Sequence, residues 1–367
     1  MTLRIRAFDH APESEDWRRQ RALFDRVLGP EIGALRDRAL RWVTLGNPVD
    51  LDEPRRYVVD DGGTIVASLG RMPVRFSVRG EPMLMRYSHD LLVDPAYRGQ
   101  KLAQRLVSEV AERSDSPVGG LWMNAPSYAI HLRCGWRGMP PARSQMRVLD
   151  AAAFLGRRMA PGLARLAAAP ARGLLAIASP DAWGSGPAGY EVSEEGEPGV
   201  DADALWSEVA PRLGVAAVRD AAYLRWRFVE APHAQYTLLQ VRREGALRGH
   251  AALRLPLPEA PDSSAVIVDL LACPSEPRAI TALARAALAL ARARGATSLM
   301  AFTTLPPFRR ALARLGFLRA PRPQTFVLSN LENSTHARAI ADASSWYLTF
   351  TDSDGDMWTG AQPPERI

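Results

Sequence analysis

The chain has 367 residues, and on length alone roughly two domains are expected. A content of 47% hydrophobic and 23% charged residues is that of a globular protein, which excludes a wholly disordered or fibrous chain. Two cysteines cannot build a disulfide framework, and no Cys/His spacing resembles a metal site. We therefore expect a cytoplasmic globular protein without a metal.

The formal net charge of +6 would suit an anionic partner, but the basic residues are scattered arginines, and Lys101 is the only lysine. No basic tract is interleaved with aromatic residues, so the sequence predicts no nucleic-acid binding. The first ten residues lack the apolar core of a secretory signal. No run of eighteen uncharged apolar residues occurs, so we also expect no membrane span.

Residues 1–150 predict an α+β unit. In chain order we expect a strand at 3–8, helices at 13–27 and 31–42, hairpins turning at 61–63 and 79–80, a helix at 101–113, a strand at 118–123 and a short helix ending near 133. Because the helix at 101–113 lies between two apolar strands, it predicts one parallel crossover.

Residues 151–188 predict a helical connector, interrupted at Pro161 and Pro170, and a Gly/Pro/Ser loop. The order of elements then repeats in residues 189–367. We expect a strand at 190–192, helices at 202–213 and 221–228, a hairpin of 236–242 with 247–255, strands at 266–272 and 297–302 around a helix at 278–294, a short helix ending at 316, and a strand at 346–350. Two similar tandem domains, 1–150 and 189–367, are the predicted architecture.

The segment after the strand that ends at Val93 has the pattern of an anion-binding turn. The turn contains Pro95 and Gly99, and a helix follows at once. Free N–H groups at the helix start, together with the helix dipole, favour phosphate. Gly99 lets a ligand approach the main chain, and Arg98 can add charged hydrogen bonds.

Two motifs here resemble the GNAT superfamily of acyl-CoA-dependent N-acyltransferases. The first is Arg/Gln-x-x-Gly-x-Gly/Ala after a strand ending in Val-x-Pro, and the second is Asn-x-x-Ala-x-x-x-Tyr-x-x-x-Gly-Phe. The matching residues are Val93, Pro95, Tyr97, Arg98, Gly99 and Ala103 in the first, and Asn124, Gly135 and Trp136 in the second. The resemblance covers residues 1 to about 147, and the second half shares only the order of its elements.

The resemblance implies two GNAT-like domains, each with a mixed central sheet, a splayed pair of parallel strands and flanking helices. It implies that acetyl-CoA binds in the first domain and that its pantetheine arm lies between the splayed strands. The implied cofactor-binding residues are Leu92, Val93, Arg98, Gly99, Gln100, Lys101, Leu102, Ala103 and Asn124. Lys101 stands where the family usually has a glycine, and we expect this position to be helical already.

The resemblance also implies the catalytic candidates. His131 stands at the position of the family's tyrosine, which protonates the departing thiolate, and Tyr128 is the reserve donor. His89 or Asp90, on the strand before the turn, is the candidate base for the acceptor amine. For each residue, ordinary capping, pairing or packing is the alternative, with water then taking the proton.

The second half lacks the phosphate turn, since Cys273-Pro274-Ser275-Glu276 stands there, and Leu312 occupies the position of the proton donor. We interpret it as a repeat without a cofactor site, which forms one wall of the acceptor cleft. The run 352–356 is interpreted as a polar turn and not as a calcium loop. The predicted activity is transfer of an acetyl group to a primary amine of a small polar acceptor such as an amino sugar. Alternatives are a non-catalytic acyl-CoA-binding or assembly protein, and a Fem-type aminoacyl-tRNA-dependent transferase.

Overall fold

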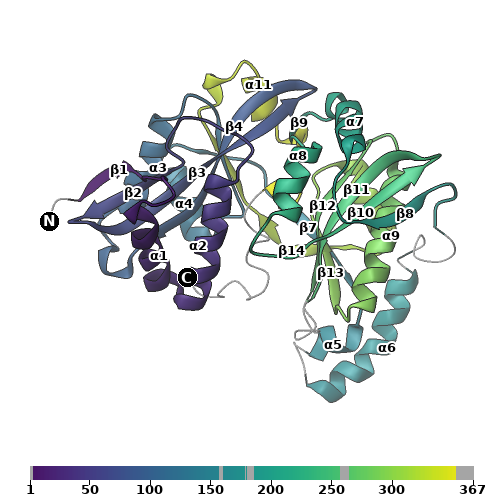
Figure 1. The fold of residues 1–367 in the computed structure, drawn as a ribbon. Helices are drawn as coiled ribbons and strands as arrows, with labels where there is room; N and C mark the ends of the chain where they lie inside the picture. Colours follow the sequence, from purple (N-terminus) through teal and green to yellow (C-terminus); the bar gives the residue numbers. More distant parts are fainter. Residues whose placement is uncertain (1–2, 157–159, 178, 180–185, 257–263, 353–367) are drawn as a thin grey trace.

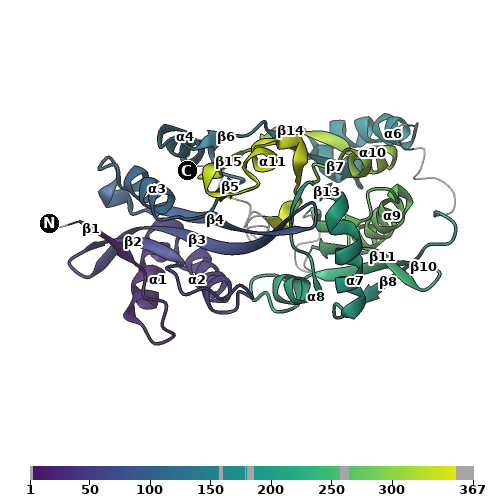
Figure 2. The same ribbon diagram turned by 90° about the horizontal axis from the view of Figure 1, so that it is seen from above.

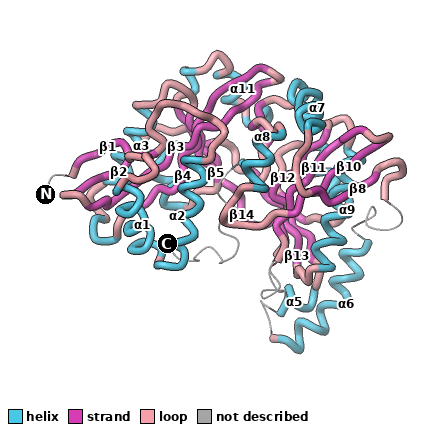
Figure 3. The backbone as a smooth tube through the Cα atoms, viewed as in Figure 1, coloured by secondary structure: helices cyan, strands magenta, loops and turns pink. Residues whose placement is uncertain are grey.

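A computed structural model describes residues 3–156, 160–177, 179, 186–256 and 264–352. Two large mixed sheets, each flanked by helices, lie side by side (Figures 1 and 3). The mixed α+β class that the sequence predicts is confirmed. Among the described residues, no helix has both the length and the apolar character needed to cross a membrane.

The first sheet is built on a meander. Its strands are β1 (Arg4–Ala7), β2 (Arg56–Asp61), β3 (Thr64–Val78), β4 (Glu81–Val93), β5 (Val118–Leu121), β6 (Arg137–Gly138), β9 (Val215–Ala217), β15 (Phe326–Ser329) and β16 (Trp346–Tyr347). Helices α1 (Glu15–Leu28) and α2 (Pro30–Leu45) lie on one side, and α3 (Leu102–Glu112) and α4 (Ala125–Arg133) lie on the other (Figure 2).

Alternation along β2 explains why helices can cover both faces of this sheet. Val58 packs in a cluster with Trp17 and Phe24 of α1, whereas Val59 packs in a cluster with Leu106 of α3. Successive side chains of a strand point to opposite faces, so a continuous apolar strand requires a helix layer on each side.

The second sheet has the order β14-β7-β13-β12-β11-β10-β8. Its strands are β7 (Ala142–Val148), β8 (Glu191–Glu195), β10 (Thr237–Arg243), β11 (Ala246–Arg254), β12 (Ala265–Ala272), β13 (Ser298–Ala301) and β14 (Leu318–Gln324). The helices of this half are α5 (Ala151–Gly156), α6 (Pro161–Ile177), α7 (Val200–Val209), α8 (Ala221–Leu224), α9 (Pro277–Ala293), α10 (Pro306–Arg314) and α11 (Ala337–Ala341). The long helix α9 packs on the sheet through Ile280, Leu283 and Ala287.

Several local expectations are wrong in detail. Pro170 lies inside α6 and does not end it. The expected helix at 221–228 is a single α turn followed by a π-helical turn at Arg225–Val229. The strand expected at 346–350 is the two-residue strand β16. Residues 353–356 of the expected polar turn, and part of the loop at 180–189, lie outside the described residues.

The two sheets exchange strands, which the sequence analysis did not foresee. β7 precedes residue 150, yet it pairs with β13 and β14 of the second sheet. In return, β15 comes from the C-terminal half and inserts between β5 and β6 of the first sheet. The domain boundaries expected from the sequence stay a prediction, but hydrogen bonding between strands crosses the boundary at residue 150 in both directions.

We predict that this exchange couples the unfolding of the two halves. Leu328 in β15 is fully buried, so Leu328→Ala should lower the free energy of unfolding by about 2–5 kcal/mol. It should shift a single cooperative transition, measured by circular dichroism during urea unfolding. The control Leu318→Ala, at a half-exposed position in β14, should change stability by less than about 0.5 kcal/mol. Two separate transitions, with only one shifted by Leu328→Ala, would contradict the coupling.

Candidate active site

The site begins where β4 leaves β5. The two strands pair in parallel only at Arg86 with Val118 and at Tyr87 with Gly119. β4 continues to Val93, whereas β5 ends at Leu121 and Trp122 follows with a left-handed φ of 59°. In the described chain, the edge of β4 beyond Tyr87 therefore has no β5 partner, and an extended ligand can pair with its main chain.

A bulge distorts β4 inside this unpaired stretch. The pairing with β3 jumps from Gly70–His89 to Ser68–Leu92, and Asp90 has a positive φ of 51°. A bulge redirects the side chains and the main-chain groups of its strand. Leu92 and Val93, two of the expected cofactor residues, follow the bulge directly and are half-buried.

The turn after β4 presents main-chain N–H groups to solvent. Asp94 holds its start, because its carboxylate accepts hydrogen bonds from Ala96 N at 3.0 Å and from Arg26 Nε at 2.6 Å. Gly99 has a φ of 83°, with open space where a Cβ would lie. The expected residues Arg98, Gly99, Gln100 and Lys101 are exposed, and no side chain caps α3. The first turn of an amphipathic helix is thus available to an anion.

Lys101 corrects one expectation. It is not helical but is the N-cap of α3, in a left-handed conformation with φ 59° and ψ 20°. Such a conformation costs a residue with a side chain on the order of 1 kcal/mol or more, because the Cβ crowds the carbonyl oxygen. This explains why a glycine suits the position.

The remaining cofactor candidates differ in what they can offer. Leu102 buries its side chain in the cluster beneath α3, so only its main chain faces the turn. Ala103 is half-buried beside it. Asn124 is the N-cap of α4, and its side-chain oxygen accepts a hydrogen bond from Ser127 N at 2.9 Å.

His131 is buried at the inner side of α4. Its Nδ1 lies 2.8 Å from the carbonyl oxygen of Ser127, so Nδ1 carries a proton and donates it. Burial lowers the pKa of His131, although the bond to Ser127 acts against this shift. In the neutral ring Nε2 is an acceptor, and it lies 3.4 Å from Ser88 Oγ on β4. His131 is therefore poised first to accept a proton.

Tyr128, the reserve donor, is directed elsewhere. A Cβ built on Gly138 of β6 would lie 2.6 Å from the Tyr128 hydroxyl oxygen, so this hydroxyl approaches the main chain of β6. Tyr128 packs in the cluster beneath α3, whereas Ser88 lines the pocket described below.

Asp90 lies in a buried charge cluster. It forms ion pairs with Arg36 at 3.1 Å and Arg56 at 3.3 Å, and His89 Nδ1 lies 3.2 Å from its Oδ2. Burial alone would raise the pKa of Asp90, but the charge of Arg36, the hydrogen bond to His89 and the charge of Arg56 hold it far below its ordinary value. A carboxylate held in this way is a poor proton acceptor, and this geometry favours a role for Asp90 in positioning the bulge and the two arginines.

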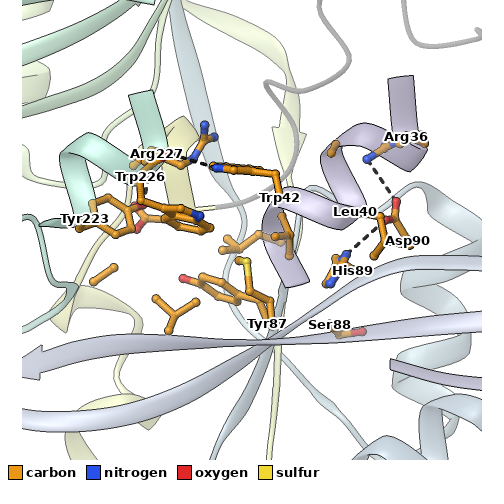
Figure 4. A pocket seen from close by; sticks show the side chains of 18 residues that line it. Arg36, Leu40, Trp42, Tyr87, Ser88, His89, Asp90, Tyr223, Trp226 and Arg227 are labelled. Carbon is orange, nitrogen blue, oxygen red and sulfur yellow. Dashed lines mark hydrogen bonds and ion pairs between the residues drawn. The ribbon is translucent and has the colours of Figure 1, made fainter. Parts of the chain in front are cut away.

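One pocket connects these residues with the second half of the chain (Figure 4). It has about 700 Å³ of empty volume, part of which is open to solvent. Ser88, His89 and Asp90 lie at one end, and α2 supplies Arg36 and Trp42. The C-terminal half supplies Tyr223, Trp226, Arg227, Thr351 and Asp352. Trp42 and Trp226 stack with ring centroids 4.5 Å apart.

The sequence analysis missed most of this lining. Ser88 and Tyr87 flank the candidates His89 and Asp90 on the same strand, so strand alternation could have drawn attention to them. Nothing in the sequence brings Arg36, Trp226 and Asp352 together, because 315 residues lie between the first and the last. Asp352 was interpreted only as part of a polar turn.

Known proteins support the same interpretation of this fold. Residues 2–139 match the family model described as an acetyltransferase (GNAT) domain. This segment contains the diverging strands, the bulge and the uncapped helix. Residues 2–139 form a GNAT domain. No curated protein sequence matched the chain.

Solved structures extend the similarity of fold beyond the GNAT domain. A GCN5-related N-acetyltransferase from Anabaena variabilis aligns with a TM-score of 0.59 at 11% identity, over 89% of this chain and 72% of that one. N-myristoyltransferase of Saccharomyces cerevisiae, solved with bound myristoyl-CoA, aligns with a TM-score of 0.55 at 13% identity, over 89% and 82%. A protein from Kribbella flavida, also named a GCN5-related N-acetyltransferase, aligns with a TM-score of 0.55 at 15% identity, over 89% of this chain and 70% of that one.

The second half repeats the divergence of the GNAT domain but fills it. β12 pairs in parallel with β13 only from Ala265 to Ile267, and within the described chain it continues to Ala272 without this partner. Here the buried Tyr347 donates its hydroxyl to the carbonyl oxygen of Leu270. Cys273 is buried, and the start of α9 carries Glu276, which repels phosphate. These features support the interpretation that this repeat holds no cofactor.

We predict that Asp90 stabilises the GNAT domain at neutral pH. Asp90→Asn removes the carboxylate that pairs with the buried Arg36 and Arg56, and should cost about 3 kcal/mol or more above pH 5. Because the folded-state pKa of Asp90 is lowered, its contribution is complete above the unfolded-state value near 4 and is lost as pH falls below it. The difference between the two proteins in urea unfolding should therefore shrink from pH 6 to pH 3. The control is the exposed ion pair of Glu15 with Arg18. Glu15→Gln should change the free energy of unfolding by a small amount that stays nearly constant between pH 6 and pH 3.

A pair of substitutions separates backbone strain from charge at Lys101. Lys101→Ala keeps the left-handed strain and removes the ammonium group, whereas Lys101→Gly removes both. We expect both to weaken CoA binding by about 3- to 10-fold at low salt, measured by calorimetry, because only the charge contacts phosphate. Recovery of affinity in the glycine variant alone would show instead that backbone strain limits binding.

Proposed function

We propose that the chain is an acyl-CoA-dependent N-acyltransferase that transfers an acetyl or other short acyl group to a primary amine. One observation carries the proposal. The unpaired edge of β4 runs directly into an exposed turn and an uncapped helix start, so a thiol arm and a diphosphate can bind in continuous succession.

The site residues suit the charges that develop during acyl transfer. The carbonyl oxygen of the thioester becomes an oxyanion when the amine attacks, and a main-chain N–H near Leu92 or Val93 is the proposed donor. The cluster of Arg36, Arg56 and Asp90 carries a net charge of about +1 behind this bulge, which favours negative charge there.

Ser88 and His131 offer a route for one proton. The attacking nitrogen must lose a proton, and the departing thiolate must gain one. Ser88 lines the pocket and its Oγ lies 3.4 Å from His131 Nε2, so we propose that the neutral ring takes the proton through Ser88 and returns it to the sulfur. The role expected of His131, that of donor to the thiolate, thus becomes the second half of a shuttle.

The residues that line the pocket indicate how polar the acceptor is. An amino sugar carries many hydroxyl groups, each of which needs a hydrogen-bonding partner. Most of the lining consists of apolar and aromatic side chains such as Met72, Val74 and Leu121. This environment favours an amine on a less polar body over the amino sugar that the sequence analysis suggested.

The test is a thermal-shift screen with CoA, acetyl-CoA and longer acyl-CoAs, followed by release of free thiol with a panel of amines. Stabilisation by acyl-CoA together with amine-dependent thiol release is the expected result. Tight binding without turnover on any amine would favour the non-catalytic acyl-CoA-binding protein. Indifference to every CoA species would favour the aminoacyl-tRNA-dependent transferase, and the proposal would then fail.

We predict that Ser88→Ala and His131→Gln each lower kcat by about 100-fold, because both interrupt the shuttle. Their KM for acyl-CoA should stay near that of the wild type, since neither contacts the phosphate turn. Tyr128→Phe serves as the comparison and should retain kcat within about 3-fold. A large loss in the Tyr128 variant, with activity kept in the other two, would assign the proton donor to Tyr128.

A further inference from the structure

Several residues that line the pocket have a buried polar atom without a hydrogen-bonding partner among the described residues. Two of these atoms are oxygens, the hydroxyl of Tyr87 and Oδ1 of Asp352, and another is the indole Nε1 of Trp226. Tyr87 is on β4, beside Ser88, and Asp352 is the last residue of the 3₁₀ turn Phe350–Asp352, at the end of the described chain. A buried polar atom without a partner costs free energy, and both residues line one pocket, so we look there for a ligand that satisfies the two oxygens.

Asp352 is held in place by its other oxygen. Oδ2 accepts hydrogen bonds from Arg219 Nη2 and from Thr349 N, both at 2.7 Å. The carboxylate is fully buried, and these contacts fix its orientation, which leaves Oδ1 for the pocket. Such a fixed carboxylate is prepared for a donor and needs little reorganisation when one arrives.

The charge balance around Asp352 also calls for a cation. Arg219 pairs with both Asp352 and Asp269, and Asp269 accepts a hydrogen bond from Thr349 at 2.7 Å and lies 3.1 Å from His250 Nε2. One arginine therefore faces two carboxylates, and these three buried groups together have a formal net charge of about −1. A buried net charge is expensive, and a bound ammonium group would neutralise it.

The walls beside this cluster suit an apolar, cationic ligand. Tyr223 and Trp226 flank the pocket, and Trp42 stacks on Trp226 (Figure 4). Aromatic faces attract an ammonium group as well as an apolar or aromatic body. Arg36 and Asp90 line the same pocket, with Arg56 behind them, so a cluster of net positive charge and one of net negative charge both lie at its walls.

We propose that Asp352 and Tyr87 bind the ammonium group of the acceptor, that Asp352 takes its first proton, and that the acceptor is a primary amine on an aromatic or other apolar body. The proposal rests on the acyltransferase function above. In the reaction, one N–H proton passes to Asp352 and later to solvent. The nitrogen then forms the C–N bond, the C–S bond breaks, and the second proton reaches the sulfur through Ser88 and His131.

The electrostatics of Asp352 support this role. Burial raises the pKa of Asp352, Arg219 opposes the shift, and the charge of Asp269 adds to it. The other titratable groups near this cluster include Tyr87, Tyr223, Tyr347 and His250, and the buried Arg227 acts on Tyr223 from the same pocket wall. A carboxylate with a raised pKa is a better proton acceptor than an ordinary aspartate.

Binding can be tested without turnover, in the full chain saturated with CoA, by following tryptophan fluorescence. The probes are 2-phenylethylamine, its uncharged analogue 2-phenylethanol, and glucosamine. We expect 2-phenylethylamine to bind at least roughly 10-fold more tightly than either of the others. Asp352→Asn should weaken it by roughly 30-fold, and Tyr87→Phe by roughly 5-fold, with little effect on 2-phenylethanol.

Asp269→Asn is the matched control. Like Asp352→Asn, it leaves one arginine facing one carboxylate, so both variants should fold, as circular dichroism will check. Asp269 does not line the pocket, and its variant should keep 2-phenylethylamine affinity within roughly 3-fold. Equal losses in the two variants, or equal affinity for 2-phenylethanol, would overturn the proposal. Displacement of 2-phenylethylamine by the acyl chain of dodecanoyl-CoA would also overturn the proposal, because it would show that the pocket binds the acyl chain and not the amine.

The pH profile gives a second readout if the amine is acylated. The acid limb of kcat/KM for 2-phenylethylamine should follow Asp352. Because the charge of Asp269 raises the pKa of Asp352, Asp269→Asn should move this limb to lower pH, and Asp352→Asn should abolish it. An acid limb that neither variant changes would assign the proton to another group. Failure of CoA itself to bind would instead refute the acyltransferase function.

Discussion

The parting of two parallel strands is the constraint on which the rest of the structure depends. Main-chain groups on the inner edge of a strand need partners, and β4 runs several residues past the last pair with β5. In the described part of the GNAT domain this edge has no β5 partner, and we propose that a ligand pairs with it. The second half meets the same need internally, because the hydroxyl of Tyr347 contacts Leu270 on β12. The same fold thus gives a binding edge in one half and a closed core in the other.

Electrostatics divide the pocket between these halves into two ends. Near the bulge, two arginines face one aspartate, whereas near the C-terminal turn one arginine faces two aspartates. Both clusters are buried, so water screens them little, and their opposite net charges act across the pocket. A cluster with net negative charge favours an incoming ammonium group, and a cluster with net positive charge favours an oxyanion.

Strand exchange gives this polarised pocket its geometry. β15 lies between β5 and β6 of the first sheet, and β7 lies between β13 and β14 of the second. Residues from the far end of the chain are therefore held against β4 by sheet hydrogen bonds as well as by side-chain packing. A wall from the second half can then be placed precisely beside the bulge, as preorganised acid–base chemistry requires.

The sequence by itself determined the features that depend on neighbours along the chain. Apolar periodicity predicted the meander of β2 to β4, the helix α3 and the repeated order of elements, and the residues from Val93 to Ala103 predicted the anion-binding turn. Local chemistry suffices for these, because a helix start and a tight turn are encoded within a few residues. Even here the conformation of Lys101 was predicted wrongly as helical, since the residue type lysine does not indicate a left-handed N-cap.

Only the tertiary structure decided which groups meet in the pocket. His131 became a buried, neutral acceptor because α4 packs it against Ser88 and Trp136. Asp90 became a counter-ion because α2 and β2 bring Arg36 and Arg56 to it. Asp352 faces β4 because the last strands return to the first sheet. A proton affinity depends on burial and on charges contributed by distant segments, and these are set only when the chain has folded.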